Sequence, residues 1–407
     1  MTIARIGVVG AGTMGAGIAQ IACLGGLETL LHDPVPDALG VGIARVEEGL
    51  AKGAARGRWS DADAEAAKGQ LRASGSLQNL GPAELVIEAA PEELGLKRQL
   101  MSELAEICGP DAILATNTSS LPVTAIAAAV PRPERVCGMH FFNPPALMEL
   151  VEIVAGDETS EPTLAAATEV ARRMGRTPIR TADGPGFLAN RLFRPFSLEA
   201  LRMLGEGIAS HEEIDRIYRL GGGFRMGPFE LMDQIGLDVG FEVARSFWEQ
   251  SFHEPRWQPH PIQARMVEAG RHGRKTGRGY YSYGDGPHRD ADPELDVERP
   301  IADEDELARV AGERAPEVLS RVVVQIVNEA AFALEARVGS ADDMDTAMRL
   351  GFNWPLGPIE WSERLDLESV LEQLDRLREL RGEVYRAAPV LRRAAAAGAG
   401  LRTVSGT

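Results

Sequence analysis

The chain has 407 residues, 44% of them hydrophobic and 25% charged, and its net charge is −17. This length predicts two or three domains, and the acidic balance argues against nucleic acid or an anionic membrane as a partner. Three cysteines without metal-ligand spacing indicate a reducing compartment such as the cytoplasm, and we expect no metal site. No apolar run reaches the roughly 18 residues that a membrane span needs, and we expect no secretory leader.

The start of the chain predicts a dinucleotide site. An apolar strand at 3–9 is followed at once by Gly10-Ala-Gly-Thr-Met-Gly15 and then by a helix at 16–24. In this setting Gly10 makes the tight turn, Gly12 lets the backbone approach a pyrophosphate, and Gly15 lets helix and strand pack closely. The helix N-terminus adds N–H groups and the positive end of a dipole. The residues expected to bind the cofactor are Gly10, Gly12, Thr13, Met14 and Gly15.

A second strand, predicted at 28–32, ends at Asp33. A carboxylate at this place accepts a hydrogen bond from a ribose 2′-hydroxyl and repels a 2′-phosphate, so NAD is favoured over NADP. The next stretch, 38–73, reads as two helices with Trp59 between them. It carries a small basic cluster (Lys52, Arg56 and Arg58), which is either a solvated helix face or a contact for the phosphates of a carrier such as coenzyme A.

Further strands are predicted at 84–90 and 112–116, with a helix at 94–107 after the first of them. Loops beyond the carboxyl ends of parallel strands line the ligand crevice, which places Glu92, Ser119 and His140 on one rim. A helix N-cap is the alternative role for Ser119.

A histidine and a carboxylate stand on two neighbouring apolar runs. His140 ends the run 135–139, and Glu152 lies inside the predicted strand 150–154. A carboxylate within such a strand is costly unless it has a partner. We therefore predict a His140–Glu152 pair, in which the carboxylate orients the imidazole for proton transfer. The alternative is a buried histidine satisfied by the backbone and a solvated edge-strand glutamate.

Together these motifs resemble the 3-hydroxyacyl-CoA dehydrogenase family. The resemblance runs in order to about residue 283 and includes Asn117-Thr-Ser-Ser-Leu121, His140-Phe-Phe-Asn-Pro144, and Pro185-Gly-Phe187 followed by Asn190-Arg191. It implies that His140 is the catalytic base and Glu152 its partner, and that Ser119 and Asn190 hold substrate oxygens. The family positions that touch the cofactor fall on Glu92, Lys97, Asn143 and Lys275. Near the coenzyme A, Gly49 stands where relatives have a serine, and Arg56 stands where a lysine occurs.

The second half of the chain is predicted to be helical and duplicated. A helix at 163–175 and a last strand at 177–182 precede a long helix at 187–204. The stretch from 197 to 230 then repeats without gaps at 327 to 360, an offset of 130 positions. Asn190 maps to Ser320 and Lys275 to Ser405, so the second copy reads as a packing element that has lost the polar residues.

We therefore expect an α/β Rossmann-type domain followed by two all-α domains. The predicted ranges are 1–184 for the NAD-binding domain, 185–283 and 304–407 for the helical copies, and 284–303 for a flexible linker. A flexible linker of this length spans about 25 Å, enough for the two copies to pair within one chain, as single-copy family members pair between chains.

The resemblance implies NAD-dependent oxidation of (S)-3-hydroxyacyl-CoA thioesters, as in the β-oxidation of fatty acids. His140 would take the proton from the C3 hydroxyl while hydride passes to the nicotinamide. Two alternatives stay open. One is a dehydrogenase of free 3-hydroxy acids such as carnitine or gulonate, and the other is a dinucleotide-binding protein without turnover.

Overall fold

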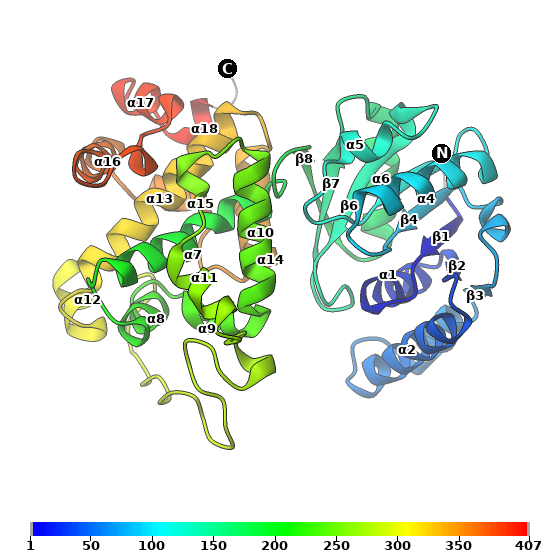
Figure 1. Cartoon of the computed structure of the whole chain (residues 1–407), viewed down its shortest axis with the longest axis horizontal. Helices are drawn as coiled ribbons and strands as arrows, with labels where there is room; N and C mark the ends of the chain where they lie inside the picture. Colours follow the sequence, from blue (N-terminus) through cyan, green and yellow to red (C-terminus); the bar gives the residue numbers. More distant parts are fainter. Residues whose placement is uncertain (1–2, 405–407) are drawn as a thin grey trace. The chain divides into compact units, whose positions relative to one another are not determined.

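The protein divides into two compact units, residues 1–187 and 188–407 (Figure 1). The structure, a computed structural model, describes residues 3–404. The first unit is a Rossmann-like α/β domain and the second is helical, as the sequence predicts. Ser405 lies outside the described residues.

The first unit is organised on an eight-stranded sheet in the order β3-β2-β1-β4-β5-β6-β7-β8. Neighbouring strands run parallel except β6 and β7, which are antiparallel. The bounds are β1 Arg5–Val9, β2 Glu28–His32, β3 Leu71–Ser74, β4 Leu85–Glu88, β5 Ile113–Thr116, β6 Val136–Phe141, β7 Leu150–Ala155 and β8 Thr177–Ala182.

Helices cover both faces of this sheet and create two separate apolar cores. On one face lie α1 (Thr13–Leu24), α2 (Pro36–Ala55), α3 (Asp61–Lys68) and α6 (Glu161–Arg173). On the other lie α4 (Leu94–Ile107) and α5 (Val123–Ala127). The near-continuous apolar strands fit a sheet that is buried on both sides.

The strand order reverses beside β1, which pairs with β2 on one edge and with β4 on the other. Loops after β1, β2, β4, β5 and β6 therefore meet on one rim, where ligands bind in open α/β sheets. These loops begin the segments that carry the predicted site residues of this unit.

The prediction of two helices across 38–73 is correct for α2 and α3, and the Trp59 indole between them donates to the Leu50 carbonyl. It is wrong for the end of the range, where β3 extends the sheet beside β2. This short strand has two exposed residues, Arg72 and Ala73, so it lacks the apolar run that marks the other strands.

The second unit is built around two long helices, α7 (Ala189–Gly205) and α13 (Ala315–Glu335), which pack against each other. The shorter helices around them are α8 (His211–Leu220), α9 (Pro228–Ile235), α10 (Leu237–Gln250), α11 (Pro261–Glu268), α12 (Glu304–Ala311), α14 (Ala341–Phe352), α15 (Pro358–Glu363), α16 (Leu367–Arg381), α17 (Pro389–Ala396) and α18 (Leu401–Val404).

The segment 284–303 lies between η4 (Arg274–Thr276) and α12, but it is not a free tether. Arg289 pairs with the buried Glu230 at 2.6 Å, and Asp292 pairs with Arg219 at 2.8 Å. The Ile301 amide bonds to the Gly221 carbonyl at 2.9 Å. The expectation of a flexible linker is therefore wrong, because these contacts fix the segment on the helical unit.

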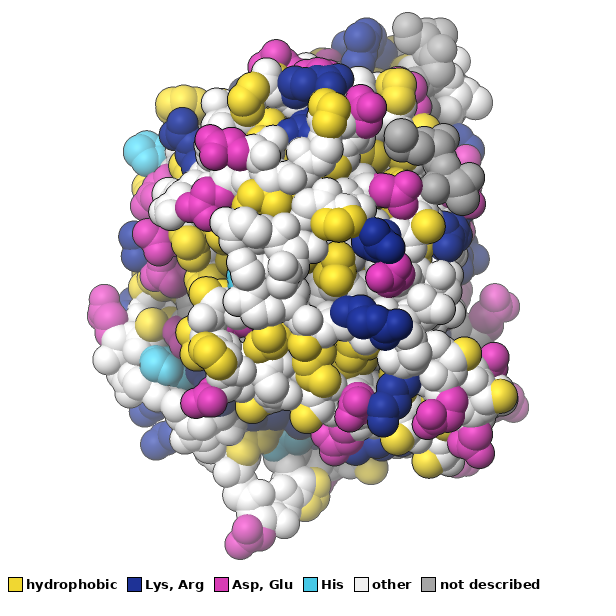
Figure 2. Space-filling model, turned by 90° about the vertical axis from the view of Figure 1, so that its right-hand side faces the viewer, with side chains coloured by type: hydrophobic (Ala, Val, Ile, Leu, Met, Phe, Trp, Pro, Cys, Tyr) yellow, Lys and Arg dark blue, Asp and Glu magenta, His cyan; other side chains and the backbone are white. Residues whose placement is uncertain are grey.

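On the face drawn in Figure 2, basic and acidic side chains are interspersed among polar and apolar ones. The excess of acidic residues in the chain therefore forms no single acidic patch on this face. None of the helices described between residues 3 and 404 combines the length and the apolar composition that a membrane span requires.

Candidate active site

His140 and Glu152 form the predicted pair. The two residues are register partners in the antiparallel strands β6 and β7, so both side chains emerge on the same face of the sheet. His140 Nδ1 lies 2.7 Å from Glu152 Oε2, and the carboxylate is fully buried. A carboxylate that accepts from Nδ1–H leaves Nε2 as the nitrogen that can take up a proton. This pair can therefore act as an oriented general base.

Two aromatic rings stand beside the imidazole. The centroid of Phe142 lies 4.7 Å from that of His140, and the centroid of Phe187 lies 5.8 Å away. Phe187 is buried and has a φ of 53°, a backbone conformation that is uncommon for a bulky residue. Its packing against Val123 and Val154 holds it in this conformation.

Glu92 organises the loop that carries Ser119. One oxygen, Oε1, accepts from the Thr118 hydroxyl at 2.6 Å, from the Ser119 amide at 2.9 Å and from the Ser120 amide at 3.1 Å. Burial opposes ionisation of Glu92, but the Thr118 hydroxyl and the Lys97 ammonium outweigh it, so its pKa lies below the usual range. Glu92 and Ser119, from two different loops, therefore meet on the rim as predicted.

Lys97 forms a buried ion pair beneath this loop. It is 1% exposed, and its ammonium lies 2.7 Å from Glu88 and 3.4 Å from Glu92. Glu88 also accepts from the Thr116 hydroxyl at 2.7 Å, so the pair joins the ends of β4 and β5 to α4. A contact between Lys97 and a cofactor stays a prediction, because the ammonium is already engaged by two carboxylates.

The glycine-rich loop has the form that a pyrophosphate needs. Gly10 has a φ of 98°, and a side chain at Gly15 would come within 1.8 Å of the Gly10 carbonyl oxygen. A side chain at Gly12, by contrast, would meet no protein atom within 4 Å. Gly12 caps α1 without a side-chain hydrogen bond, and no acidic residue stands in the first turn that starts with Thr13 and Met14. The amides there are suited to an anion.

Asp33 is held beside this loop. One carboxylate oxygen accepts from the Ala11 amide at 2.9 Å, and the other accepts from the Val35 amide at 3.0 Å. These bonds fix the carboxylate at the end of β2, the place where a ribose hydroxyl is recognised in this fold.

The loop after β6 carries Asn143 and lies against the dinucleotide helix. A side chain at Gly17 of α1 would stand 2.9 Å from the Pro145 ring, so the glycine allows the loop to approach closely. Asn143 itself is exposed in this loop. The arrangement is compatible with its predicted contact to the cofactor.

The basic cluster lies at the end of α2. Arg56 is the exposed C-cap residue of that helix, whereas Lys52 forms a 2.6 Å ion pair with Glu48. Gly49 allows a close approach of Gln20, whose Oε1 would stand 2.3 Å from an added side-chain carbon. A contact of Arg56 with coenzyme A stays a prediction.

Two predicted residues belong to the helical unit. Asn190 lies in the first turn of α7, and Lys275 lies in η4. Lys275 is 46% exposed, and its ammonium lies 2.6 Å from the Asp238 carboxylate at the start of α10. This ion pair lowers the pKa of Asp238. The roles of both residues at the reaction site stay predictions.

Sequence reasoning missed Asn117 and Glu88. The Asn117 side-chain oxygen accepts from the Phe141 amide at 2.9 Å and so ties the end of β5 to the residue after His140. The sequence does contain a signal for Asn117, which opens the motif Asn117–Leu121 that carries the family resemblance. Glu88 is a fully buried carboxylate within an apolar strand, the same signal that singled out Glu152.

Comparisons with known proteins identify the family of this chain. The 3-hydroxyacyl-CoA dehydrogenase NAD-binding domain family matches residues 5–184, and the family of the C-terminal domain of the same enzymes matches residues 186–283 and 318–407. A 3-hydroxyadipyl-CoA dehydrogenase of Escherichia coli is 34% identical, over 97% of this chain and 98% of its own. A 3-hydroxybutyryl-CoA dehydrogenase of Mycobacterium tuberculosis is 39% identical, over 69% of this chain and 99% of its own.

Solved structures show the same similarity. The crystal structure of a 3-hydroxybutyryl-CoA dehydrogenase from Escherichia coli superposes with a TM-score of 0.89 at 33% identity, covering 98% of this chain and 99% of the other. The matched N-terminal family is an NAD-binding domain, so NAD is the cofactor. The chain belongs to the 3-hydroxyacyl-CoA dehydrogenase family.

Proposed function

We propose that this chain oxidises (S)-3-hydroxyacyl-CoA thioesters to 3-oxoacyl-CoA with His140 as the general base. The observation that carries the proposal is the buried His140–Glu152 pair on the strands that complete the dinucleotide domain. Nε2 takes the proton of the C3 hydroxyl, and Glu152 stabilises the imidazolium that forms. General-base catalysis of this kind contributes ~10²–10⁴-fold.

The chain's own groups also bind and orient the reactants. Ser119 and Asn190 hold substrate oxygens, and Glu92 holds the Ser119 loop in place through the hydrogen bonds that its Oε1 accepts. Arg56 contacts the coenzyme A phosphates. Bound NAD supplies the hydride acceptor, and its proposed contacts are Gly10, Gly12, Thr13, Met14, Gly15, Asp33, Glu92, Lys97, Asn143 and Lys275.

We prefer a thioester substrate over a free 3-hydroxy acid because the full-length relatives carry names of acyl-CoA dehydrogenases. The test is NADH formation from (S)-3-hydroxybutyryl-CoA and from free 3-hydroxybutyrate under the same conditions. We expect turnover of the thioester and little of the free acid. Faster turnover of the free acid would favour the alternative, and no turnover of either would favour a non-catalytic protein.

The free, buried thiols of Cys23, Cys108 and Cys137 support a reducing compartment, for which we propose the cytoplasm.

We also propose that the helical unit is an internal repeat. Helices α8, α9 and α10 begin at residues 211, 228 and 237, and α14, α15 and α16 begin 130 positions later in each case. Asp215 accepts from the Phe229 and Glu230 amides, and Asp345, its counterpart at the same offset, accepts from the amides of Ile359 and Glu360.

The two copies meet as a pseudo-two-fold pair. Arg191 Nε lies 2.7 Å from the Glu329 carboxylate, and Arg321 Nε lies 2.6 Å from that of Glu199. Arg321 is the counterpart of Arg191 at the offset of 130 positions, and Glu329 is the counterpart of Glu199. The second pair is therefore the first pair with the two copies exchanged. This reciprocity is what a two-fold interface requires. Equivalent residues also touch each other, since the rings of Phe224 and Trp354 lie 5.5 Å apart.

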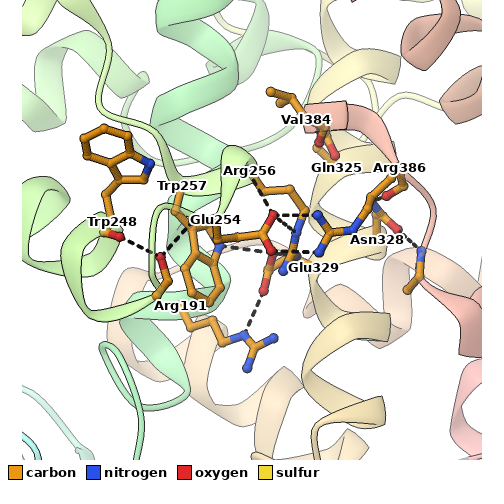
Figure 3. A network of polar contacts seen from close by, with 12 residues as sticks. Arg191, Trp248, Glu254, Arg256, Trp257, Gln325, Asn328, Glu329, Val384 and Arg386 are labelled. Carbon is orange, nitrogen blue, oxygen red and sulfur yellow. Dashed lines mark hydrogen bonds and ion pairs between the residues drawn. The ribbon is translucent and has the colours of Figure 1, made fainter. Parts of the chain in front are cut away.

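Figure 3 shows one of these clusters, in which Glu329 of the second copy meets Arg191, Arg256 and Trp257 of the first. The second copy has therefore kept polar residues of the interface, among them Arg321 and Glu329. The expectation that the second copy has lost its polar residues is wrong for these two positions. Such a chain buries within itself the face that single-copy relatives would bury in a dimer.

A further inference from the structure

Arg194 is a buried cation on α7 that lacks a carboxylate partner. The residue is 7% exposed, and within residues 3–404 its Nε has no hydrogen-bond partner and no acidic side chain forms an ion pair with it. Its guanidinium stands over the rings of Phe193 and Phe247, 5.8 and 5.1 Å from their centroids. Burial alone lowers its pKa to about 10. An unpaired buried charge is costly, and such groups are enriched at functional sites.

The other buried arginines of this unit have carboxylate partners. Arg219, Arg256 and Arg321 each face a buried glutamate: Glu230, Glu329 and Glu199 respectively. Figure 3 shows the second of these pairs within its network. The unit therefore supplies internal anions where a buried arginine serves packing. The isolation of Arg194 calls for a carboxylate that the folded chain does not provide.

The place of Arg194 indicates where that carboxylate comes from. Arg194 follows Asn190 by four residues in α7, so the two side chains leave the same face of the helix about 6 Å apart along its axis. Asn190 is the residue proposed to hold an oxygen of the substrate near its reacting carbon. A group bound by Arg194 would thus lie one helical turn beyond the reacting end of the acyl chain.

We propose that Arg194 binds a carboxylate at the far end of the acyl chain, so that the preferred substrate is the coenzyme A thioester of a 3-hydroxy dicarboxylic acid. This inference rests on the proposed function and specifies its substrate class. In a six-carbon diacid, three carbon–carbon bonds separate the hydroxyl-bearing carbon from the terminal carboxylate, a span comparable to one helical turn. The planar guanidinium suits a carboxylate, which supplies the missing counter-charge.

The same residue disfavours ordinary acyl chains. A methyl-ended chain of equal length would leave the guanidinium buried without a partner and would place apolar carbon against a charge. Discrimination between substrates is a difference of affinities, and an unpaired charge against the wrong substrate contributes to it. Arg194 would therefore act on specificity and not on the proton transfer at His140.

The test compares kcat/KM for 3-hydroxyadipyl-CoA and 3-hydroxyhexanoyl-CoA, which have equal chain length and differ in the terminal carboxylate. We expect the wild type to prefer the dicarboxylate by about 10²-fold, the scale of losing one partner of a buried charge pair. Arg194→Met should abolish this preference while turnover of the hexanoyl substrate is retained or increased. Arg194→Lys should keep part of the preference, because lysine keeps the positive charge but lacks the two parallel N–H donors with which a guanidinium binds a carboxylate.

Heat stability separates this role from a packing role. Replacing an unpaired buried charge by an apolar side chain of similar length should leave Tm unchanged or raised. The matched control is Arg191→Met on the same helix, which breaks the pair with Glu329. It should lower Tm and leave the ratio of the two substrates unchanged.

Equal substrate ratios for the wild type and Arg194→Met would overturn the inference, and so would a wild type that prefers the hexanoyl substrate. Either result leaves the proposed oxidation intact. A wild type that oxidises neither thioester would instead contradict the proposed function.

Discussion

His140 and Glu152 lie directly opposite each other in the antiparallel strands β6 and β7, with Nδ1 and Oε2 2.7 Å apart. The strand pairing itself sets this geometry, because register partners project to the same face. The pairing of β6 with β7 therefore orients the base.

Glu152→Gln should lower kcat by about 10²-fold, within the ~10²–10⁴-fold contribution of a general base, because an amide does not stabilise the imidazolium. Steady-state kinetics with a 3-hydroxyacyl-CoA thioester checks this. Glu149→Gln, on an exposed residue just before the same strand, is the control and should behave as wild type. Equal rates for the two variants would remove Glu152 from the mechanism.

Asp33→Ala should weaken NAD binding and narrow the preference over NADP, since it removes a ribose acceptor and a charge that repels a 2′-phosphate. Titration of each cofactor by fluorescence measures both effects. Asp37→Ala removes an exposed carboxylate from the first turn of α2 and serves as the control. A wild type that prefers NADP would show that this role of Asp33 is wrong.

The pKa of Glu92 lies below its usual range in the folded protein, where the Thr118 hydroxyl and Lys97 outweigh its burial. The stabilisation is therefore complete above the unfolded pKa of about 4.3 and is lost as pH falls through the folded value. Glu92→Gln does not titrate, so the difference in Tm from wild type should be wide at neutral pH and should shrink at acidic pH. A difference that is independent of pH would contradict this account.

Glu199→Gln and Glu329→Gln should destabilise the helical unit by similar amounts, about 3–5 kcal/mol each, because each removes a buried counter-charge and leaves Arg321 with Glu206 and Arg256 with Glu254 as the remaining carboxylate partners. Urea unfolding measures the loss. Glu335→Gln at the end of α13 weakens a longer contact with Arg393 at 3.4 Å and is the control. A large effect at one of the two glutamates alone would argue against the pseudo-two-fold pairing.

Truncation after residue 285 tests the same pairing in another way. It removes α13 and exposes the apolar face of α7, so the shortened chain should dimerise or become insoluble. Size-exclusion chromatography and a thermal melt distinguish these outcomes. A truncated chain that stays monomeric and as heat-stable as the parent would show that the two copies do not depend on each other.

The sequence predicted the parts of the site that follow from one local pattern. A buried carboxylate in an apolar strand indicated Glu152, and glycines between a strand and a helix indicated the dinucleotide loop. Glu88 carries the same signal, because it is a carboxylate within the apolar strand β4. The short strand β3 was missed because Leu71–Ser74 has neither a continuous apolar run nor regular alternation.

Features that depend on partners far along the chain were not predictable. Glu92 gains its role from acceptor bonds to residues 118–120, and Glu329 gains its role from arginines more than 70 positions away. Arg194 is conspicuous because its surroundings lack a carboxylate, and a sequence does not show what a folded interior leaves out.

The most direct test of the central claim is NADH formation from NAD and (S)-3-hydroxybutyryl-CoA by the wild type and by His140→Gln, with NADH binding measured for both. We predict turnover by the wild type and a loss of at least about 10²-fold in the variant, the scale of general-base catalysis. NADH binding should be nearly unchanged, because the imidazole acts in proton transfer and does not hold the dinucleotide. A variant whose kcat stays within tenfold of the wild type would contradict the assignment of His140 as the base.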